Sequence, residues 1–149
     1  MREAVRLAVE SVAEGGGPFG CVIEKDGAIV GAGTNRVTRD NDPTAHAEVV
    51  AIRQACERLE SFQLDGCTLY CSCEPCPMCL GAIYWARPDR VYYAASREDA
   101  AAGGFDDLFI HDEIAADPDR RRILMTQIAF ASAGDPFDAW RRAEDKIRY

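Results

Sequence analysis

The sequence predicts an α/β fold of three layers, an α/β/α sandwich whose central five-stranded mixed sheet is covered by helices on both faces. Two observations predict it: segments with apolar residues at three- and four-residue spacing alternate along the chain with short apolar stretches that end at turn residues. The 149 residues contain neither an internal repeat nor a polar linker. We therefore expect a single domain, residues 1–149.

The first predicted elements are a helix and a β-hairpin. Residues 1–14 form the helix, and its apolar spacing comes from Val5, Ala8, Val9 and Val12. Gly15-Gly16-Gly17-Pro18 then ends it as a cap and turn, because this run lacks the Gly-Lys-Ser/Thr of a phosphate-binding loop. The stretches 19–24 and 28–33 are joined through Lys-Asp-Gly, and Asp-Gly between two apolar stretches predicts a hairpin.

Two helices and a strand follow. A helix is predicted from about Pro43 to Leu59, with Asp42 as its N-cap and Pro43 in its first turn. One face of this helix is apolar: Val49, Ile52, Cys56 and Leu59. Residues 68–72 are predicted as a strand, and Pro75 opens a helix that extends to Trp85. Because the last helix is apolar on nearly every side, we expect it to be buried.

The C-terminal part completes the predicted sheet. Residues 90–96 and 123–131 are expected to be strands, and residues 97–119 between them an irregular, acidic connection. Gly134-Asp135-Pro136 then precedes a final helix. Its apolar face carries Phe137, Trp140 and Ile147.

Charge and cysteine content narrow the function classes. The chain has 17 Lys and Arg against 25 Asp and Glu, and a net charge of −8 disfavours nucleic acid as a partner. No apolar run is long enough for a membrane span, and the first residues do not resemble a signal peptide, so we expect a cytoplasmic protein without a membrane partner. The seven cysteines are then expected to stay reduced, which favours metal binding or catalysis.

Four residues carry the chemical signal. His46, Cys76 and Cys79 offer one nitrogen and two sulfurs, a set that suits one tetrahedral zinc ion with its fourth position open to water. His46 and the Cys76/Cys79 pair each lie at a predicted helix start. The helix dipole there favours the thiolate form of the two cysteines. Glu48, two residues after His46, is placed about 200° around the helix from it and can take a proton from the zinc-bound water.

Other interpretations of these cysteines stay open. Cys-x-x-Cys at a helix start after a strand also resembles a redox motif. A structural zinc site could use a set of four thiols: Cys71, Cys73, Cys76 and Cys79. A noncatalytic metal-binding module is a third interpretation. His111 lies in the acidic connection and is expected at the surface.

His-x-Glu followed by Pro-Cys-x-x-Cys is the signature of zinc-dependent nucleobase deaminases. Beyond this signature the chain resembles the bacterial guanine deaminases of the cytidine deaminase fold over nearly its whole length. The similar stretches are 41–48, 72–88, 104–107 and 136–149. The least general of these are Gly-Phe-Asp-Asp at 104–107 and the aromatic C-terminus. Cys71 departs from the threonine that is more common in that family.

The resemblance implies a reaction and a set of substrate contacts. Zinc-activated water attacks C2 of guanine, Glu48 shuttles protons, and the products are xanthine and ammonia. Asp107 contacts the exocyclic amine as the second catalytic residue, and Asn35 hydrogen-bonds the purine. Phe19 and Trp85 form walls of the pocket. Without the resemblance, Phe19 and Trp85 are expected in the core as readily as in a pocket. Asn35 is then expected to be a turn residue, and Asp106 and Asp107 to lie in a solvated acidic turn.

The resemblance also implies a homodimer. In that family the C-terminal segment, here about residues 135–149, is exchanged between subunits and closes the neighbouring active site. Tyr149 then becomes a substrate-binding lid residue. Other substrates stay open: guanosine, another free base or triazine, or the adenosine of a transfer RNA. For the last, Arg120-Arg121-Arg122 and the basic residues near the C-terminus are the electrostatic support.

Overall fold

The computed structural model describes residues 1–105 and 107–148, which form two compact units, Met1–Ile110 and His111–Tyr149. The elements in chain order are α1 (Arg2–Ala13), β1 (Gly20–Lys25), β2 (Ala28–Thr34), α2 (Val37–Asp40), α3 (Ala47–Leu59), β3 (Cys67–Cys73), α4 (Pro77–Ala86), β4 (Arg90–Ala95), α5 (Arg97–Ala102), α6 (Leu108–Ala115), the 3-10 helix η1 (Pro118–Arg120) and α7 (Asp135–Arg142). Among the described residues, no helix has the length and apolar character that crossing a bilayer requires.

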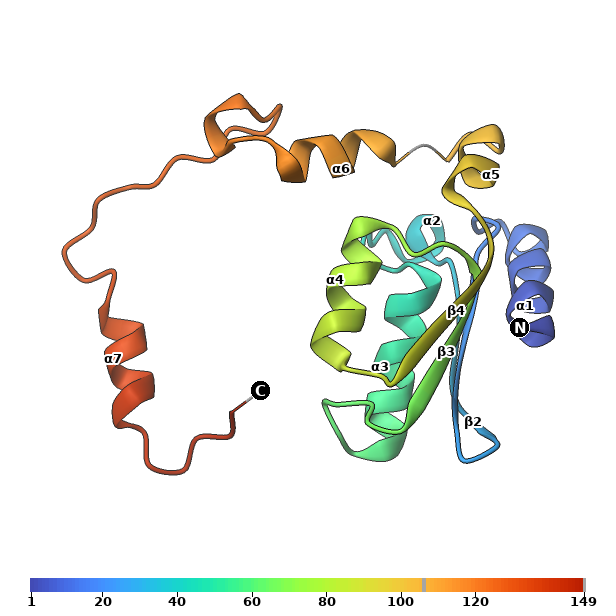
Figure 1. The fold of residues 1–149 in the computed structure, drawn as a ribbon, viewed down its shortest axis with the longest axis horizontal. Helices are drawn as coiled ribbons and strands as arrows, with labels where there is room; N and C mark the ends of the chain where they lie inside the picture. The colour runs from blue at the N-terminus through green and yellow to red at the C-terminus, as the bar shows by residue number, and fades with distance from the viewer. Residues whose placement is uncertain (106, 149) are drawn as a thin grey trace. The chain divides into compact units, whose positions relative to one another are not determined.

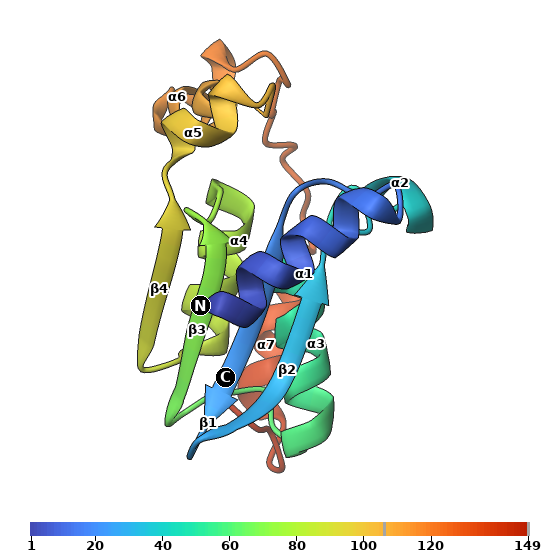
Figure 2. The ribbon, with the colours of Figure 1, turned by 90° about the vertical axis from the view of Figure 1, so that its right-hand side faces the viewer.

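The first unit is built on a mixed sheet that Figure 1 shows nearly edge-on. Its strand order is β2-β1-β3-β4 (Figure 2). β1 runs antiparallel to both β2 and β3, and β3 runs parallel to β4. The predicted hairpin is confirmed: Asp26 and Gly27 connect β1 to β2, with φ angles of 52° and 80°. Positive φ at both residues is the requirement of a tight type I′ connection, which explains the Asp-Gly pair.

Helices flank both faces of this sheet (Figure 2). α1 lies on one face and α3 and α4 lie on the other. Glycines permit the close approach, since a Cβ on Gly20 would collide with the Ala4 carbonyl of α1, and one on Gly33 would collide with the Ala47 carbonyl of α3. The predicted layering is therefore confirmed for this unit. Its core lies between the sheet and α3, around Ile23 and Leu69.

The face that α1 buries differs from the expected one. Ala4, Ala8 and Ser11 are buried, while Val9 is 68% exposed and the other two valines of the predicted apolar set are exposed as well. The spacing predicted the helix correctly, but not the side that faces the sheet. The small residues are buried because the helix lies directly against Gly20, where a larger side chain has no room.

Two helices of the opposite layer correct the sequence prediction. α3 begins at Ala47 instead of Pro43, because Asp42 accepts hydrogen bonds from the Thr44 amide (2.8 Å) and hydroxyl (2.7 Å) and so caps a turn that precedes the helix. α4 is not buried on all sides: Cys79, Ile83 and Ala86 are buried, whereas Trp85 is 65% exposed. One face of α4 packs against the rest of the first unit, and the opposite face is exposed.

The predicted fifth strand is absent from the described residues. The sheet has four strands, and residues 124–130 have no regular secondary structure. Strand formation needs a neighbouring strand for the backbone hydrogen bonds, and apolar composition alone does not supply one. The connection after β4 is also more regular than expected, since α5, α6 and η1 lie within residues 97–119. Ser96 and Asp99 form a capping box at the start of α5.

In the second unit the predicted C-terminal helix is present as α7, with a proline in its first turn. Phe137 and Trp140 lie on this helix and remain exposed within the described chain, and Ile147 lies beyond its end and is also exposed.

Candidate metal centre

His46 is placed at the point where a turn becomes a helix. It is the N-cap of α3, with extended backbone angles (φ −69°, ψ 155°), and the Ala45 amide donates to the Asp42 carbonyl at 3.1 Å in the turn before it. The Arg36 amide donates to the Ala45 carbonyl at 2.9 Å, which ties the turn to the chain that leaves β2. The imidazole is therefore carried by backbone that hydrogen bonds hold on both sides.

Cys76 and Cys79 lie in the first turn of α4. Cys76 is its N-cap, with extended angles (φ −64°, ψ 168°), and Pro77 follows as the first helical residue. The fixed φ of proline favours a helix start at this position. The three-residue spacing then places both thiols on the same side of the first turn.

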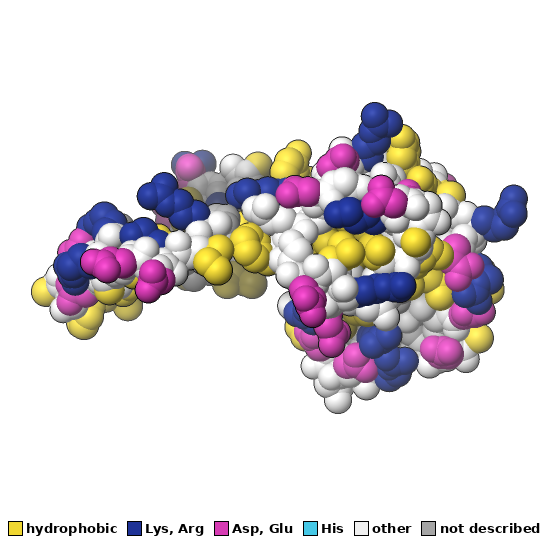
Figure 3. All heavy atoms as spheres, turned by 90° about the horizontal axis from the view of Figure 1, so that it is seen from below, with side chains coloured by type: hydrophobic (Ala, Val, Ile, Leu, Met, Phe, Trp, Pro, Cys, Tyr) yellow, Lys and Arg dark blue, Asp and Glu magenta, His cyan; other side chains and the backbone are white. Residues whose placement is uncertain are grey.

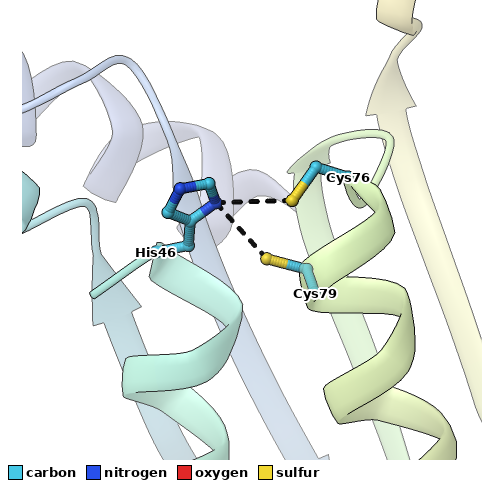
Figure 4. Close-up of side chains that lie close together, drawn as sticks. All are labelled: His46, Cys76 and Cys79. Atoms are coloured by element: carbon cyan, nitrogen blue, oxygen red, sulfur yellow. Dashed lines mark hydrogen bonds between the residues drawn. The ribbon is translucent and has the colours of Figure 1, made fainter. Parts of the chain in front are cut away.

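The three side chains converge (Figure 4). Nδ1 of His46 lies 3.5 Å from the Sγ atoms of both Cys76 and Cys79, and the three candidate ligand atoms lie within 4.8 Å of one another. With Zn–N of about 2.1 Å and Zn–S of about 2.3 Å, tetrahedral geometry requires about 3.6 Å between nitrogen and sulfur. The donor types and the spacing therefore fit one zinc ion.

The electrostatics of the two thiols prepare them as ligands. A hydrogen bond from Cys79, with a further contribution from His46, lowers the pKa of Cys76 to about 4. The same hydrogen bond, together with burial, raises the pKa of Cys79. The opposed shifts make Cys76 the more acidic thiol of the pair. The pKa of His46 is raised by its hydrogen bond to Cys76 and by the charges of nearby groups, which include Glu48 and Asp107.

Glu48 lies beside this group in the first turn of α3. It is 8% exposed, and burial raises the pKa of its carboxyl group. A hydrogen bond links it to Cys79, which places the carboxyl group next to the metal ligands. A buried carboxyl group with a raised pKa beside a metal site is suited to proton transfer near neutral pH.

The other cysteines of β3 do not join the group. Cys71 pairs in register with Cys21 of β1, and their Sγ atoms are 3.8 Å apart in the core. Cys73 donates a hydrogen bond to the Ser96 carbonyl at 3.4 Å. A structural zinc site with four thiols is therefore wrong for this chain, because two of the four sulfurs point to other partners.

Residues 1–95 match the family described as the cytidine and deoxycytidylate deaminase zinc-binding region. The match covers more than half of the chain and includes the three convergent side chains. The chain belongs to this deaminase family. The His-x-Glu and Pro-Cys-x-x-Cys segments of the family signature therefore supply the metal ligands and the neighbouring carboxylate.

Individual relatives refine the comparison. The chain is 57% identical to the guanine deaminase of Bacillus subtilis, an alignment that covers 100% of this chain and 96% of the relative. The X-ray structure of guanine deaminase from Bacillus subtilis superposes with a TM-score of 0.98 at 58% identity, and covers 99% of this chain and 95% of that one. A tRNA-specific adenosine deaminase of Aquifex aeolicus is 39% identical, over 73% of this chain and 71% of its own length.

Three of the predicted substrate residues of this deaminase lie on segments next to the metal ligands. Asp107 is near enough to contribute to the electrostatics of His46 and of Cys73. Asn35 follows β2 and is adjacent to Arg36, which is hydrogen-bonded to the residue before His46. Phe19 precedes β1, and its carbonyl accepts a hydrogen bond from the Asn35 amide at 3.2 Å, which links it to the same segment. Their roles toward a substrate stay predictions.

Trp85, another predicted residue, is not brought to the metal ligands. Trp85 is six residues beyond Cys79 on α4, which places it about 9 Å farther along the helix axis. Tyr149 and Asp106 lie outside the described residues. His111 is half-buried rather than fully exposed, and it belongs to the second unit.

Sequence reasoning assigned no role to Phe105. The rings of Phe105 and Phe19 meet edge to face, with centroids 5.0 Å apart and planes at 86°. An aromatic residue inside the family-specific Gly-Phe-Asp-Asp segment was the available signal.

A charged pair beside the metal ligands also went unassigned. The Glu74 carboxylate forms an ion pair with the Arg97 guanidinium at 2.9 Å and accepts a hydrogen bond from the Arg97 amide at 3.2 Å. This pair links the loop before Cys76 to the start of α5. Nothing in the local sequence pairs two residues so far apart, so only the fold reveals the contact.

Proposed function

We propose that this chain catalyses the hydrolytic deamination of guanine to xanthine and ammonia. The observation that carries the proposal is the full-length similarity to a guanine deaminase, 57% identity over 100% of the chain, combined with a convergent His46, Cys76 and Cys79 group. Similarity that extends over the whole chain favours this substrate over those of relatives that match about three quarters of it.

The chemistry divides between the metal and a carboxylate. His46, Cys76 and Cys79 would hold a zinc ion, which would supply the activation of water for attack on the base. Glu48 accepts the proton that the attacking water releases and delivers it to a ring nitrogen of guanine. It then transfers the proton of the hydroxyl group added at C2 to the amine, which leaves as ammonia as the C2 carbonyl forms. Its burial favours this role, because a raised pKa brings the carboxyl group closer to the working pH.

Substrate placement falls to side chains around the metal centre. Phe19, packed edge to face with Phe105, offers an aromatic wall for a planar base. In this proposal Asn35 supplies a directional hydrogen bond, and Asp107 accepts one from the exocyclic amine. We assign Trp85 to the wall of the pocket as well, and Tyr149 to the pocket of the neighbouring subunit as a lid residue.

We further propose a homodimer in which about residues 135–149 are exchanged. Two surfaces, each taken by itself, support it. β4 is the outer strand of the sheet and exposes Tyr92 and Tyr93. In the second unit, residues 123–130 keep five large apolar side chains exposed: Ile123, Leu124, Met125, Ile128 and Phe130. Burial of such surfaces against a second copy is strongly favourable.

Transfer RNA is the alternative substrate that the relatives raise. The net charge of −8 opposes it. Basic and acidic side chains are interspersed on the face drawn in Figure 3, so that face offers no continuous basic field.

We also place the enzyme in the cytoplasm, where the reducing environment keeps Cys76 and Cys79 available as metal ligands.

The decisive experiment is a substrate screen with zinc-loaded protein. Ammonia release is measured with guanine, guanosine, adenine, cytosine, ammeline and a transfer-RNA anticodon stem-loop, and xanthine is identified as the product of guanine. We expect guanine to have the highest kcat/KM. Turnover of guanosine or of the RNA at a higher kcat/KM than guanine would overturn the substrate assignment. The dimer is tested separately, by analytical ultracentrifugation at the protein concentration used in the activity assay.

A further inference from the structure

The backbone of Asn35 is held at both of its polar atoms. Its amide donates to the Phe19 carbonyl at 3.2 Å, and its carbonyl accepts a hydrogen bond from the Ser11 hydroxyl at 3.2 Å. Ser11 lies in the last turn of α1 and is 2% exposed. A buried hydroxyl needs a partner, and here that partner is the residue that we assign to bind the purine.

The glycine turn after α1 packs against the same residue. A Cβ on Gly16 would collide with the Asn35 carbonyl and would lie 2.5 Å from the Ser11 hydroxyl oxygen. A Cβ on Gly17 would lie 3.2 Å from Cγ of Asn35 and 3.3 Å from Cδ2 of Phe19. The side-chain carboxamide of Asn35 and the Phe19 ring therefore both lie against the backbone of Gly17. At this distance only glycine fits without displacement of a neighbour.

The orientation of the Asn35 carboxamide follows from a further contact. The Val37 amide donates to Oδ1 of Asn35 at 3.3 Å. Rotation of the carboxamide by 180° would face an NH₂ group toward this N–H donor and would lose the bond. Oδ1 is thus directed to the backbone, and Nδ2 is the group that Asn35 can offer to a ligand as a donor.

We propose that Ser11 and Gly17 are positioning residues for substrate binding: they hold Asn35, and Gly17 also holds Phe19, at the place where the purine is bound. The inference rests on the proposed function and assigns a role to the triple-glycine turn beyond ending a helix. Neither residue touches the metal ligands in the described structure, so their influence is on the binding of guanine and not on proton transfer.

The test compares Ser11→Ala and Gly17→Ala with the wild-type enzyme. Loss of one hydrogen bond, or displacement of Asn35 by a few tenths of an ångström, is expected to raise KM for guanine about 5- to 10-fold and to change kcat less than about 3-fold. The zinc content stays at the wild-type value. Matched controls are Ser61→Ala, in the loop after α3, and Gly81→Ala, whose Cβ would meet nothing within 4 Å.

A double-mutant cycle separates positioning from general loosening of the fold. If Ser11 acts through Asn35, then Ser11→Ala adds nothing to KM once Asn35 is replaced by alanine. Additive effects on KM, or an unchanged KM in both single variants, would overturn the inference. If Ser11→Ala does not accumulate as folded protein, Gly17→Ala decides in a cycle in which both Asn35 and Phe19 are replaced by alanine, because Gly17 contacts both side chains. Wild-type enzyme that leaves guanine unchanged refutes the proposed function instead, so the two failures are distinguishable.

Discussion

Replacement of Glu48 by glutamine should abolish proton transfer and leave the metal site intact. Glutamine has nearly the same shape and cannot accept a proton at neutral pH. The side chain is 8% exposed, so bulk water is a poor substitute for the lost base. The metal ligands lie on other positions, two of them on a different helix, and are unchanged.

The expected magnitude follows from this role. A positioned general base contributes about 10²- to 10⁴-fold in rate, or about 2.7 to 5.5 kcal/mol of activation free energy. We therefore expect kcat for guanine to fall by at least about 100-fold, measured as xanthine formation. Metal analysis of the dialysed protein should still give one zinc ion per chain, as in the wild type.

The matched control is Glu57→Gln, the same substitution at an exposed position of the same helix, which should leave kcat unchanged. The reasoning is refuted if Glu48→Gln retains more than about a tenth of the wild-type kcat with zinc bound. It is also refuted if the zinc is lost, because Glu48 is then a structural partner of the ligands.

Three other outcomes are expected. His46→Ala should lower the zinc content from one per chain to well below one after dialysis, with loss of activity, and stoichiometric zinc in this variant would contradict the ligand assignment. Arg97→Ala breaks a partly exposed ion pair with Glu74 and should lower the free energy of unfolding by less than about 1 kcal/mol, as measured in urea; a larger loss would mean that the pair is more than a surface contact. Hydrogen bonds from Thr44 lower the pKa of Asp42 below 3.8, so its contribution to stability is present above that pH and is lost as the pH falls through the lowered value. Asp42→Asn should accordingly be less stable than the wild type at pH 7 and about equally stable near pH 2 in thermal melts; a stability difference that does not change with pH would count against this account.

The metal ligands could be predicted from the sequence because their geometry is local. Cys76 and Cys79 are one helical turn apart, and His46 and Glu48 share one helix start. A short motif then determines the relative positions within each segment. The convergence of the two segments was inferred from donor chemistry, and the 3.5 Å distances confirm it.

The positioning contacts could not be predicted in this way. Ser11 and Asn35 are 24 positions apart, and Glu74 and Arg97 are 23 apart. Such contacts depend on how α1, the sheet and α5 pack. The spacing of residues within one element does not indicate which other element it will contact. The same limitation explains why the exposed face of α4 was expected to be buried.

The sequence by itself determined where most helices and strands form and which side chains bind the metal, because both follow from periodicity and spacing along a few turns of chain. Only the tertiary structure decided which face of α1 is buried, that α3 starts at Ala47, and that the described sheet ends at β4. These depend on the space that Gly20 leaves for a helix and on the hydrogen-bonding neighbours that a strand or a helix end can reach. Packing and pairing between distant segments, not local propensity, set them.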